Sequence, residues 1–577
     1  MKFTSLKRLL SILLLLAISF SVLPPVTTTS AATREPVRGH HGMVASNDEL
    51  ASKVGVEIMK KGGNAVDAAI AVGLALAVVF PFAGNIGGGG FMLIRKKDGT
   101  TTAIDYREMA PKAATRNIYL DKNGKLIKGE GGSILGYRSA GVPGTIAGYE
   151  LALKKYGSGK IKWSDLVEPA RLLAQNGFAV PYSYVRGIAG YKDDLSKYPD
   201  SKRIFLNGGK GFEEGDRLVQ PELAQTLGRI GRLGPREFYT GKTAQLITAD
   251  MKANNGLVTL EDLKNYQAKE RKPVQGTYRG YEIISMPPPS SGGAIMLEIL
   301  NILEGYDLRS MGYNSAAKYH VVTEAMRRAF ADRAEYMGDA DFVDVPVDTL
   351  IDKKYAAKRR ESIDLTRASS SSEIGHGQIT GAEPTETTHY TVVDSEGNIV
   401  SNTYTINNGY GSAATVKGAG FLLNDEMDDF AAQPGTPNMF GLIQGERNAV
   451  QPAKRPLSAM TPTIVLRKDG TPWFALGAAG GPTIITAVLL GVINVIDHDM
   501  NIQQALDMPR IHHQWMPDQL VTEPFGLSPD TRKILEGYGQ KLSPPRTLAR
   551  ATGIMIDDKG VRLGAVDSRG PGEAVGY

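Results

Sequence analysis

The sequence predicts an α+β fold in which paired antiparallel strands and long helices form separate layers. Four pairs of strand-like segments flank short polar turns, a pattern typical of β-hairpins. These pairs are 91–95 with 101–105, 390–393 with 399–405, 463–467 with 473–477, and 553–556 with 562–565. Helical patterns lie between them, at 294–303, 316–336 and 486–497. Because single strands do not alternate with helices as they do in βαβ units, the pattern favours layered antiparallel sheet.

Two more helices are predicted near the N-terminus. Residues 46–49 have helix-start chemistry, and apolar residues then recur at every fourth position from Leu50 until Gly62. Asn64 is expected to cap a second, almost wholly apolar helix that ends before Pro81. This stretch is shorter than the roughly 20 residues that cross a membrane, so we interpret it as a buried helix.

Composition limits the possible functions. A chain of 577 residues has room for three or four domains or for one large interlocked unit. The absence of cysteine excludes disulfides, thiolate metal sites, iron–sulfur clusters and a cysteine nucleophile. The net charge is only +5, from 66 basic and 61 acidic side chains. Since this balance gives no electrostatic footprint for nucleic acid, no nucleic-acid partner is predicted.

Residues 1–32 are predicted to be a secretory signal peptide. Basic residues precede an apolar run from Leu9 to Leu23, and small residues at 30–32 offer a cleavage site. The mature protein would then begin near Thr33 and work outside the cytoplasm, either in the periplasm or as a secreted protein, without a stable membrane anchor. An uncleaved N-terminal anchor is the alternative interpretation.

Several common active-site motifs are absent or incomplete. Residues 241–243 look like the end of a phosphate-binding loop, but Arg236 stands where that loop requires glycine. The glycine run 87–90 precedes a strand instead of opening a helix, so it is not a dinucleotide fingerprint. His512 and His513 are adjacent and would diverge, so no metal site is predicted. The sequence also lacks the G-x-S-x-G elbow of the α/β-hydrolases.

With these nucleophiles excluded, threonine becomes a candidate. A threonine at a chain's N-terminus can use its own α-amine as the base that activates its hydroxyl. Thr387 fits this requirement, because a polar stretch, 367–386, precedes it and a predicted strand follows it. We expect 367–386 to be an exposed loop, although an ordinary domain linker would have the same composition. These features alone do not separate Thr387 from a structural strand threonine.

The motifs around Thr387 resemble the start of the small subunit of the γ-glutamyltranspeptidases, also called γ-glutamyltransferases. The resemblance continues through most of the chain, in ordered and separate motifs. Those motifs are 387–390, 394–398, 403–407, 422–430, 454–458, 460–463 and 480–481, with 85–91 and 105–111 upstream. The resemblance implies an N-terminal-nucleophile hydrolase fold, a four-layer αββα sandwich that both subunits build jointly. It also implies self-cleavage between Glu386 and Thr387, giving an associated large subunit, 33–386, and small subunit, 387–577.

Four residues match the catalytic groups of that family. The hydroxyl of Thr387 would attack the side-chain amide of a γ-glutamyl donor, with its freed amine as the base. Thr405 corresponds to the residue that positions the nucleophile. Gly480 and Gly481 correspond to the glycines whose N–H groups stabilise the oxyanion.

Five further residues match the groups that bind the donor. Arg107 and Ser458 would hold its α-carboxylate. Asn407, Glu426 and Asp429 would hold its α-ammonium. The family chemistry requires no metal and no organic cofactor, so none is predicted.

Two positions depart from the family pattern. Ala459 stands where most members have a second serine, which removes one hydrogen-bond donor. The segment 433–445 resembles the lid loop of part of the family, with Phe440 in place of its usual tyrosine. A hydroxyl contact from the lid to Asn407 would be missing, so we expect a looser lid.

The resemblance implies a γ-glutamyltransferase and glutathione hydrolase. Its substrates would be glutathione and related γ-glutamyl compounds, with amino acids, short peptides or water as acceptors. A related acylase, acting on cephalosporin side chains or poly-γ-glutamate, is one alternative, and a non-catalytic extracellular binding protein is another. Glu426 and Asp429 argue against a glutaryl acylase, because a glutaryl group has no α-ammonium to bind.

Overall fold

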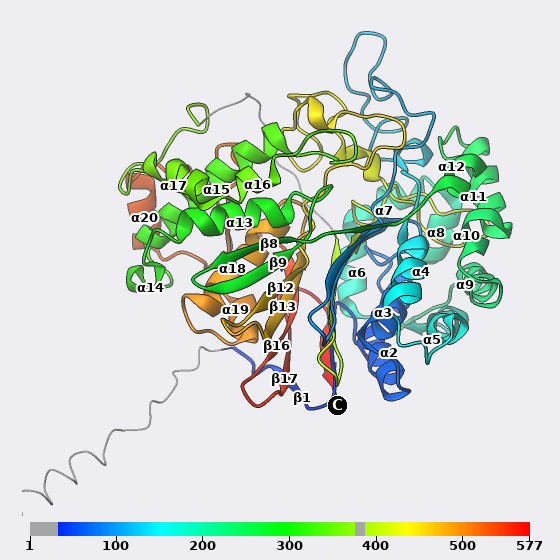
Figure 1. The fold of residues 1–577 in the computed structure, drawn as a ribbon. Helices are drawn as coiled ribbons and strands as arrows, with labels where there is room; N and C mark the ends of the chain where they lie inside the picture. The colour runs from blue at the N-terminus through cyan, green and yellow to red at the C-terminus, as the bar shows by residue number, and fades with distance from the viewer. Residues whose placement is uncertain (1–32, 375–386) are drawn as a thin grey trace, which may run out of the picture. The chain divides into compact units, whose positions relative to one another are not determined.

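Two seven-stranded sheets face each other at the centre of the unit Pro36–Tyr577 (Figure 1). The structure is a computed structural model that describes residues 33–374 and 387–577. The predicted signal sequence, residues 1–32, lies outside the described residues, as does most of the predicted exposed loop, residues 375–386. Every strand pair of the two sheets is antiparallel, as the hairpin pattern predicted.

The first sheet carries the strands that follow Thr387. Its order is β18 (Glu573–Gly576), β2 (Met43–Ser46), β10 (Thr388–Val393), β11 (Ile399–Thr405), β3 (Gly89–Arg95), β4 (Thr101–Asp105) and β7 (Lys269–Arg271). Strands β10 and β11 are therefore enclosed by β2 and β3, which precede Thr387 in the sequence.

The second sheet likewise combines strands that precede Thr387 in the sequence with strands that follow it. Its order is β1 (Val37–Gly39), β17 (Arg562–Val566), β16 (Arg550–Ile556), β13 (Pro472–Ala479), β12 (Thr463–Leu466), β9 (Tyr281–Ser285) and β8 (Val274–Tyr278). Strands β10 and β11 pack across the interface on β13, and β10 also packs on β16. Segments from both sides of Thr387 thus build both sheets and the core between them.

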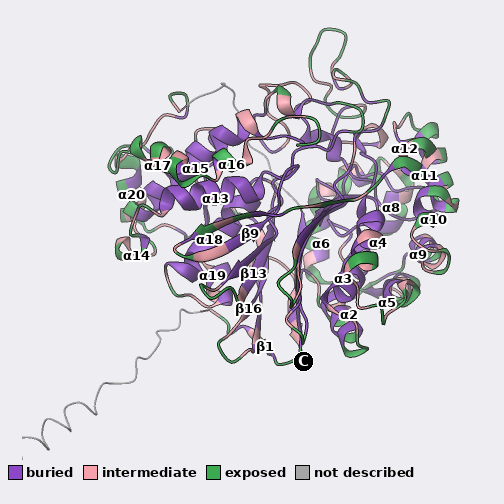
Figure 2. Cartoon of the chain, in the orientation of Figure 1, coloured by how far each residue is buried: buried purple, intermediate pink, exposed green. Residues whose placement is uncertain are grey.

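Helices cover the outer face of each sheet, which completes a four-layer αββα sandwich and confirms the predicted fold class. On the first sheet lie α2 (Glu49–Lys60), α3 (Ala65–Val79) and α4 (Thr145–Tyr156). On the second lie α13 (Gly292–Leu303), α18 (Thr483–Ile496) and α19 (Ile502–Asp507), with α15 (Ala316–Tyr336) and α17 (Lys353–Glu361) packed on α13. In Figure 2 the central strands are almost continuously buried, and so are helices α3, α13 and α18.

A further group of helices extends beyond α3 and α4, and the sequence patterns did not predict it. Its members are α5 (Trp163–Asn176), α6 (Tyr182–Ile188), α7 (Lys192–Ser196), α8 (Pro199–Phe205), α9 (Pro221–Leu233), α10 (Arg236–Thr240), α11 (Lys242–Ala253) and α12 (Leu260–Asn265). Short elements complete the fold: α14 (Leu308–Met311), α16 (Val347–Leu350), α20 (Pro529–Gly537), and the two-stranded pairs β5 (Phe178–Ala179) with β6 (Arg217–Leu218) and β14 (Ile511–His512) with β15 (Val521–Thr522).

Helix α3 shows how local sequence fixes an element. The side chain of Asn64 accepts hydrogen bonds from the backbone N–H groups of Val66 and Asp67, and the Asp67 carboxylate accepts from the N–H of Asn64. This reciprocal capping box confirms the predicted helix start. All 15 residues of the helix are buried. Among the residues described, no helix is long and apolar enough to cross a membrane.

The predicted hairpins and helices form, but one prediction is wrong in part. Residues 367–374 were expected to be exposed, yet Ser371 is fully buried. Its carbonyl accepts a hydrogen bond of 2.8 Å from the indole of Trp515, and its hydroxyl donates one of 2.6 Å to Asp518. A polar composition therefore did not mean exposure here, because buried polar partners satisfy the serine.

Candidate active site

One small cavity beside the start of β10 brings together eight of the nine predicted site residues. Its volume is about 20 Å³. The eight residues are Arg107, Thr387, Thr405, Asn407, Glu426, Asp429, Ser458 and Gly481. The ninth, Gly480, precedes Gly481 in the chain. Residues more than 300 positions apart in sequence thus meet in one place, as the resemblance implied.

Thr387 lies immediately before β10 and opposite the end of β11. Its hydroxyl is 3.5 Å from the hydroxyl of Thr405, to which it donates. The Thr405 oxygen in turn accepts the backbone N–H of Asn407 at 2.8 Å. Asn407 has a positive φ of 75°, a conformation that asparagine tolerates better than most residues. The strand register and this turn together fix the two hydroxyls against each other.

His389, two residues after Thr387, is not placed to act as a base. Burial lowers the pKa of His389 to about 3, so the ring is neutral. Its Nδ1 lies 2.8 Å from the hydroxyl of Thr403, and its Nε2 lies 3.1 Å from that of Thr391. Both ring nitrogens are therefore engaged within the sheet.

Gly480 and Gly481 form the turn between β13 and α18. Their φ values are 143° and 53°, which disfavour other residues. A Cβ on Gly480 would lie 2.6 Å from the hydroxyl of Thr483 and 2.8 Å from the Cα of Ala549. The turn also places these glycines at the N-terminus of α18, where the helix dipole favours negative charge.

Arg107 is the centre of charge in the cavity. It follows β4, is fully buried, and forms ion pairs with Glu426 and Asp429, which both lie in a 3₁₀ turn at 426–429. Its Nε also donates to the carbonyl of Pro456 at 3.2 Å. Burial alone would lower the pKa of Arg107, but the neighbouring carboxylates outweigh it and raise the pKa.

The carboxylates around Arg107 outnumber it. Glu108, also fully buried, lies 3.6 Å from the Arg107 guanidinium and joins Glu426 and Asp429. Burial raises the pKa of all three carboxyls, and Arg107 only partly offsets this. For Glu108 the pKa rises to about 7. A mostly buried group with this excess of acidic side chains is suited to binding a cation beside a guanidinium.

Ser458 and Ala459 form the wall beside Arg107. The hydroxyl oxygen of Ser458 accepts the backbone N–H of Met460 at 3.1 Å, so its own hydrogen is not used in that hydrogen bond. Ala459 lines the same wall with a methyl group, so its side chain supplies no donor there. This geometry agrees with the expected loss of one hydrogen bond.

The predicted lid segment, 433–445, contributes Phe440 and Leu442 to the lining of the cavity. The Phe440 side chain is buried and lines the cavity, and its carbonyl accepts from Gln514 at 3.1 Å. The amide of Asn407 contacts the lid through the sulfur of Met439 at 3.7 Å. Asn407 thus contacts the lid segment through a thioether, where the resemblance implies a contact with a tyrosine hydroxyl. A looser lid stays a prediction.

Two charged groups at the site were not among the predicted site residues: Glu108, which lies behind the cavity lining beside Arg107, and Arg333. Arg333 lines the cavity from helix α15. Sequence periodicity separates the buried face of a helix from its exposed face. Helix α15, however, is buried over most of its length, and its buried residues include charged ones. A single arginine on a polar-looking helix is usually exposed, so no sequence signal pointed to Arg333.

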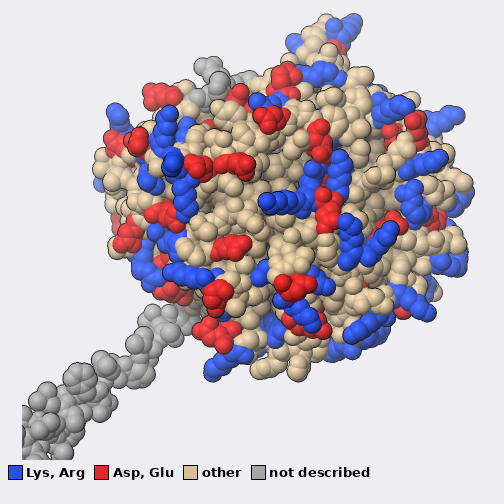
Figure 3. All heavy atoms as spheres, viewed as in Figure 1, with Lys and Arg blue, Asp and Glu red and all other residues tan. Residues whose placement is uncertain are grey.

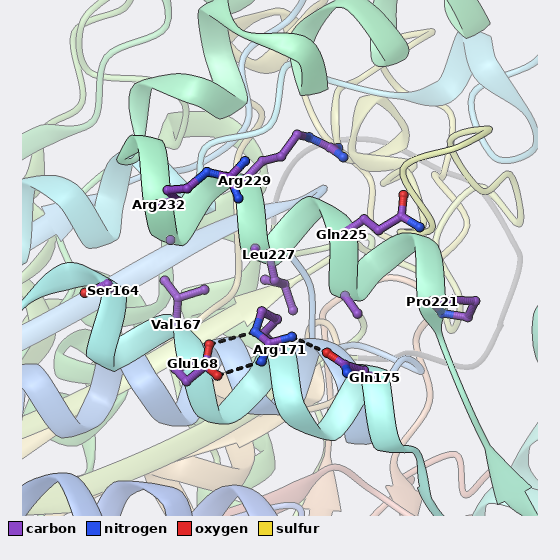
Figure 4. Close-up of a pocket in the computed structure, with 13 residues that line it drawn as sticks. Ser164, Val167, Glu168, Arg171, Gln175, Pro221, Gln225, Leu227, Arg229 and Arg232 are labelled. Carbon is purple, nitrogen blue, oxygen red and sulfur yellow. Dashed lines mark hydrogen bonds and ion pairs between the residues drawn. The ribbon is translucent and has the colours of Figure 1, made fainter.

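Cavity size does not identify the site. A much larger hollow, of about 850 Å³, lies between α5 and α9. There Arg171 is paired with Glu168 and Gln175, as Figure 4 shows, and Ser164 is the one hydroxyl in its lining. On the face of the molecule in Figure 3, basic and acidic side chains are intermixed. The convergence of hydroxyls and charges, and not volume, distinguishes the cavity at Thr387.

Comparisons with known proteins agree with this geometry. The family model described as gamma-glutamyltranspeptidase matches residues 51–577. A glutathione hydrolase proenzyme of Pseudomonas sp. (strain A14) is 50% identical over 527 residues, which cover 91% of each chain. A glutathione hydrolase proenzyme of Escherichia coli (strain K12) is 48% identical over 556 residues, covering 96% of this chain and 95% of that protein.

Solved structures give the same result. A cephalosporin acylase from Bacillus halodurans superposes with a TM-score of 0.81 at 27% identity, covering 96% of this chain and 99% of that one. A γ-glutamyltranspeptidase chain from Helicobacter pylori has a TM-score of 0.56 at 47% identity, covering 60% of this chain and 96% of that one. The chain described here belongs to the γ-glutamyltranspeptidase family, within the N-terminal-nucleophile hydrolases.

Replacing Glu108 by glutamine should change how the free energy of unfolding depends on pH. Folding raises the pKa of Glu108 from 4.5 to about 7, so the folded protein favours its neutral form. The resulting stability is present below pH 4.5 and is lost as the pH rises through 7. Because glutamine does not titrate, the variant should gain about 3 kcal/mol relative to the parent across this range. Urea unfolding at both ends of the range measures the gain; parallel profiles would contradict it.

Proposed function

We propose that this chain is the precursor of a γ-glutamyltransferase and glutathione hydrolase. It cleaves the γ-glutamyl amide of glutathione and related compounds and transfers the group to amino acids, short peptides or water. The observation that carries this proposal is the cavity itself, in which the Thr387–Thr405 hydroxyl pair faces the cluster of Arg107, Glu426 and Asp429. The membership in the γ-glutamyltranspeptidase family supports the same activity.

In the first half-reaction, the hydroxyl oxygen of Thr387 attacks the γ-carbonyl carbon of the donor. The free α-amine of Thr387 takes the hydroxyl proton and passes it to the departing amine, so that an ester replaces the amide. An α-amine has a pKa near 8 in model compounds, which suits a general base at neutral pH. Thr405 orients the attacking hydroxyl through their contact.

The developing oxyanion lies near the turn of Gly480 and Gly481. Their backbone N–H groups would donate to it, and the N-terminus of α18 adds a favourable dipole. In the second half-reaction, water or the amine of an acceptor attacks the ester carbonyl. The proton it loses returns to the Thr387 oxygen through the same α-amine, which regenerates the enzyme.

The charged end of the cavity recognises the amino-acid part of the donor. The α-carboxylate would bind Arg107 and the hydroxyl of Ser458, and the α-ammonium would bind Glu426, Asp429 and Asn407. Before substrate binds, Arg107 is paired with the same two carboxylates. A zwitterionic donor can therefore replace each of these two buried ion pairs with another.

The nucleophile requires a cut before Thr387, at its bond to Glu386. Glu386 lies outside the described residues. Strands from both sides of this bond share both sheets, which supports a large subunit, 33–386, that stays associated with a small subunit, 387–577. The Helicobacter pylori chain matches 60% of this one, and residues 33–386 make up a similar share.

We propose export as the first step of maturation. Removal of residues 1–32 as a signal peptide would deliver the precursor to the periplasm or the medium, without a stable membrane anchor. The charges of the proposed reaction are met by Arg107, backbone N–H groups and the α-amine, so we propose no metal and no cofactor.

A related acylase is the second candidate, because the Bacillus halodurans structure of similar fold is a cephalosporin acylase. A glutaryl side chain lacks the α-ammonium, so it would leave Glu426 and Asp429 as unpaired acids beside Arg107. The lid at 433–445 also argues against a long poly-γ-glutamate donor. A non-catalytic binding protein would not need the Thr387–Thr405 pair.

Replacing Thr387 by alanine should leave the chain uncut, because the attacking hydroxyl is gone. N-terminal sequencing of the parent protein should find two starts, one near Thr33 and one at Thr387. Thr387→Ser, which keeps a hydroxyl, serves as the matched control and should still be cut, if more slowly. Cleavage of the alanine variant at the same bond would show that the nucleophile is another residue.

Replacing Asp429 by asparagine should separate γ-glutamyl from glutaryl recognition. The change removes a negative charge that faces the α-ammonium, so kcat/KM for a γ-glutamyl anilide should fall by roughly 10- to 100-fold. A glutaryl anilide carries no ammonium, and its slow turnover should change little. If the parent protein prefers the glutaryl anilide, the acylase interpretation is correct instead.

A further inference from the structure

The cavity contains a second guanidinium, that of Arg333. Like Arg107, it comes from a segment that precedes Thr387, in this case from α15. Its side chain is 1% exposed and lines the cavity together with Arg107 and Ser458. The mechanism described above gives it no role.

Of the three guanidinium nitrogens of Arg333, only one donates a hydrogen bond to a described residue. Its Nε donates to the hydroxyl oxygen of Ser291 at 2.8 Å. Its Nη1 is buried and has no hydrogen-bond partner within the part of the chain that the structure describes. A buried donor without an acceptor is destabilising, and a charged one more so. An anion that enters the cavity would remove this penalty.

The neighbours of Arg333 show that it lies at the charged end of the cavity, near Ser458 and Asp429. The hydroxyl of Ser291, which accepts from Arg333, itself donates to the carbonyl of Ser458 at 2.7 Å. Asp429 is the charged group that acts on Arg333 most strongly, and it partly offsets the lowering of the Arg333 pKa by burial to about 10. Arg333 therefore remains charged at neutral pH, beside the residues proposed to hold the donor's charged groups.

We propose that Arg333 is a specificity-determining residue whose Nη1 donates a hydrogen bond to the α-carboxylate of the γ-glutamyl donor, beside Arg107 and Ser458. This inference rests on the proposed function. Arg107 faces two carboxylates before substrate binds, and it must give them up to the α-ammonium as the α-carboxylate arrives. The Nη1 of Arg333 has no partner among the described residues, so the α-carboxylate can accept a hydrogen bond from it without breaking an existing ion pair.

A purely structural role is the competing explanation. Arg333 could serve only to hold Ser291, and through it the wall at Ser458. The two roles predict different effects of Arg333 variants on different donors. A contact with the α-carboxylate affects only donors that have one, whereas a misplaced wall affects every donor.

The test compares L-γ-glutamyl-p-nitroanilide with 4-aminobutyryl-p-nitroanilide, which keeps the amine and lacks the α-carboxylate. Arg333→Gln should lower kcat/KM for the γ-glutamyl substrate by roughly 10- to 100-fold and for the other by less than about threefold. Arg333→Lys, which keeps the charge, should lose less. Inhibition constants of L-glutamate and 4-aminobutyrate give the same comparison without relying on turnover of the poorer substrate.

Ser291→Ala is the matched control, because it removes the Nε partner and leaves the guanidinium in place. Its effect on the two substrates should be equal. Equal losses in Arg333→Gln would overturn the proposal, as would failure of both Arg333 variants to undergo cleavage, since a substrate contact is not needed to mature the precursor. Hydrolysis of the γ-glutamyl anilide by the parent protein tests the proposed function separately.

Discussion

The pairing of strand β10 with β2 on one side and β11 on the other is the constraint on which the active site depends. It holds Thr387, the residue before β10, opposite Thr405. Because β2 precedes the proposed cut and β10 follows it, breaking the bond before Thr387 removes no strand pairing. The fold can therefore expose a new N-terminus in the centre of a sheet and still keep that N-terminus fixed against its partners.

The charged end of the cavity depends on the pairing of buried charges and not on strand pairing. Three acidic side chains gather around Arg107, two of them fully buried and Asp429 nearly so, and burial raises the pKa of each. Such a group is stable only while its charges are paired, since removing one partner of a buried pair leaves the other uncompensated. A donor that brings both an ammonium and a carboxylate keeps the balance. Under the proposed function, these electrostatics would favour a γ-glutamyl over a glutaryl group.

Much of this was predictable from sequence, for identifiable reasons. Polar turns between pairs of strand-like segments predicted the hairpins. The motifs around Thr387 predicted the family, the four-layer sandwich and the residues that meet in the cavity. The buried positions of Arg333 and Ser371 were not predictable, because they depend on partners distant in sequence, such as Trp515 for Ser371. Short edge strands such as β18 likewise carry too few residues for a clear pattern. The roles of the site residues remain predictions.

The proposed mechanism requires Thr387 to carry the γ-glutamyl group during turnover. The most direct measurement is acid quenching of the cleaved enzyme during steady-state hydrolysis of a γ-glutamyl anilide, followed by peptide mass spectrometry. The peptide that begins at Thr387 should gain the mass of one γ-glutamyl group, and treatment with mild base should remove it. A γ-glutamyl group on any other residue, or turnover without a detectable ester when deacylation is rate-limiting, would contradict it.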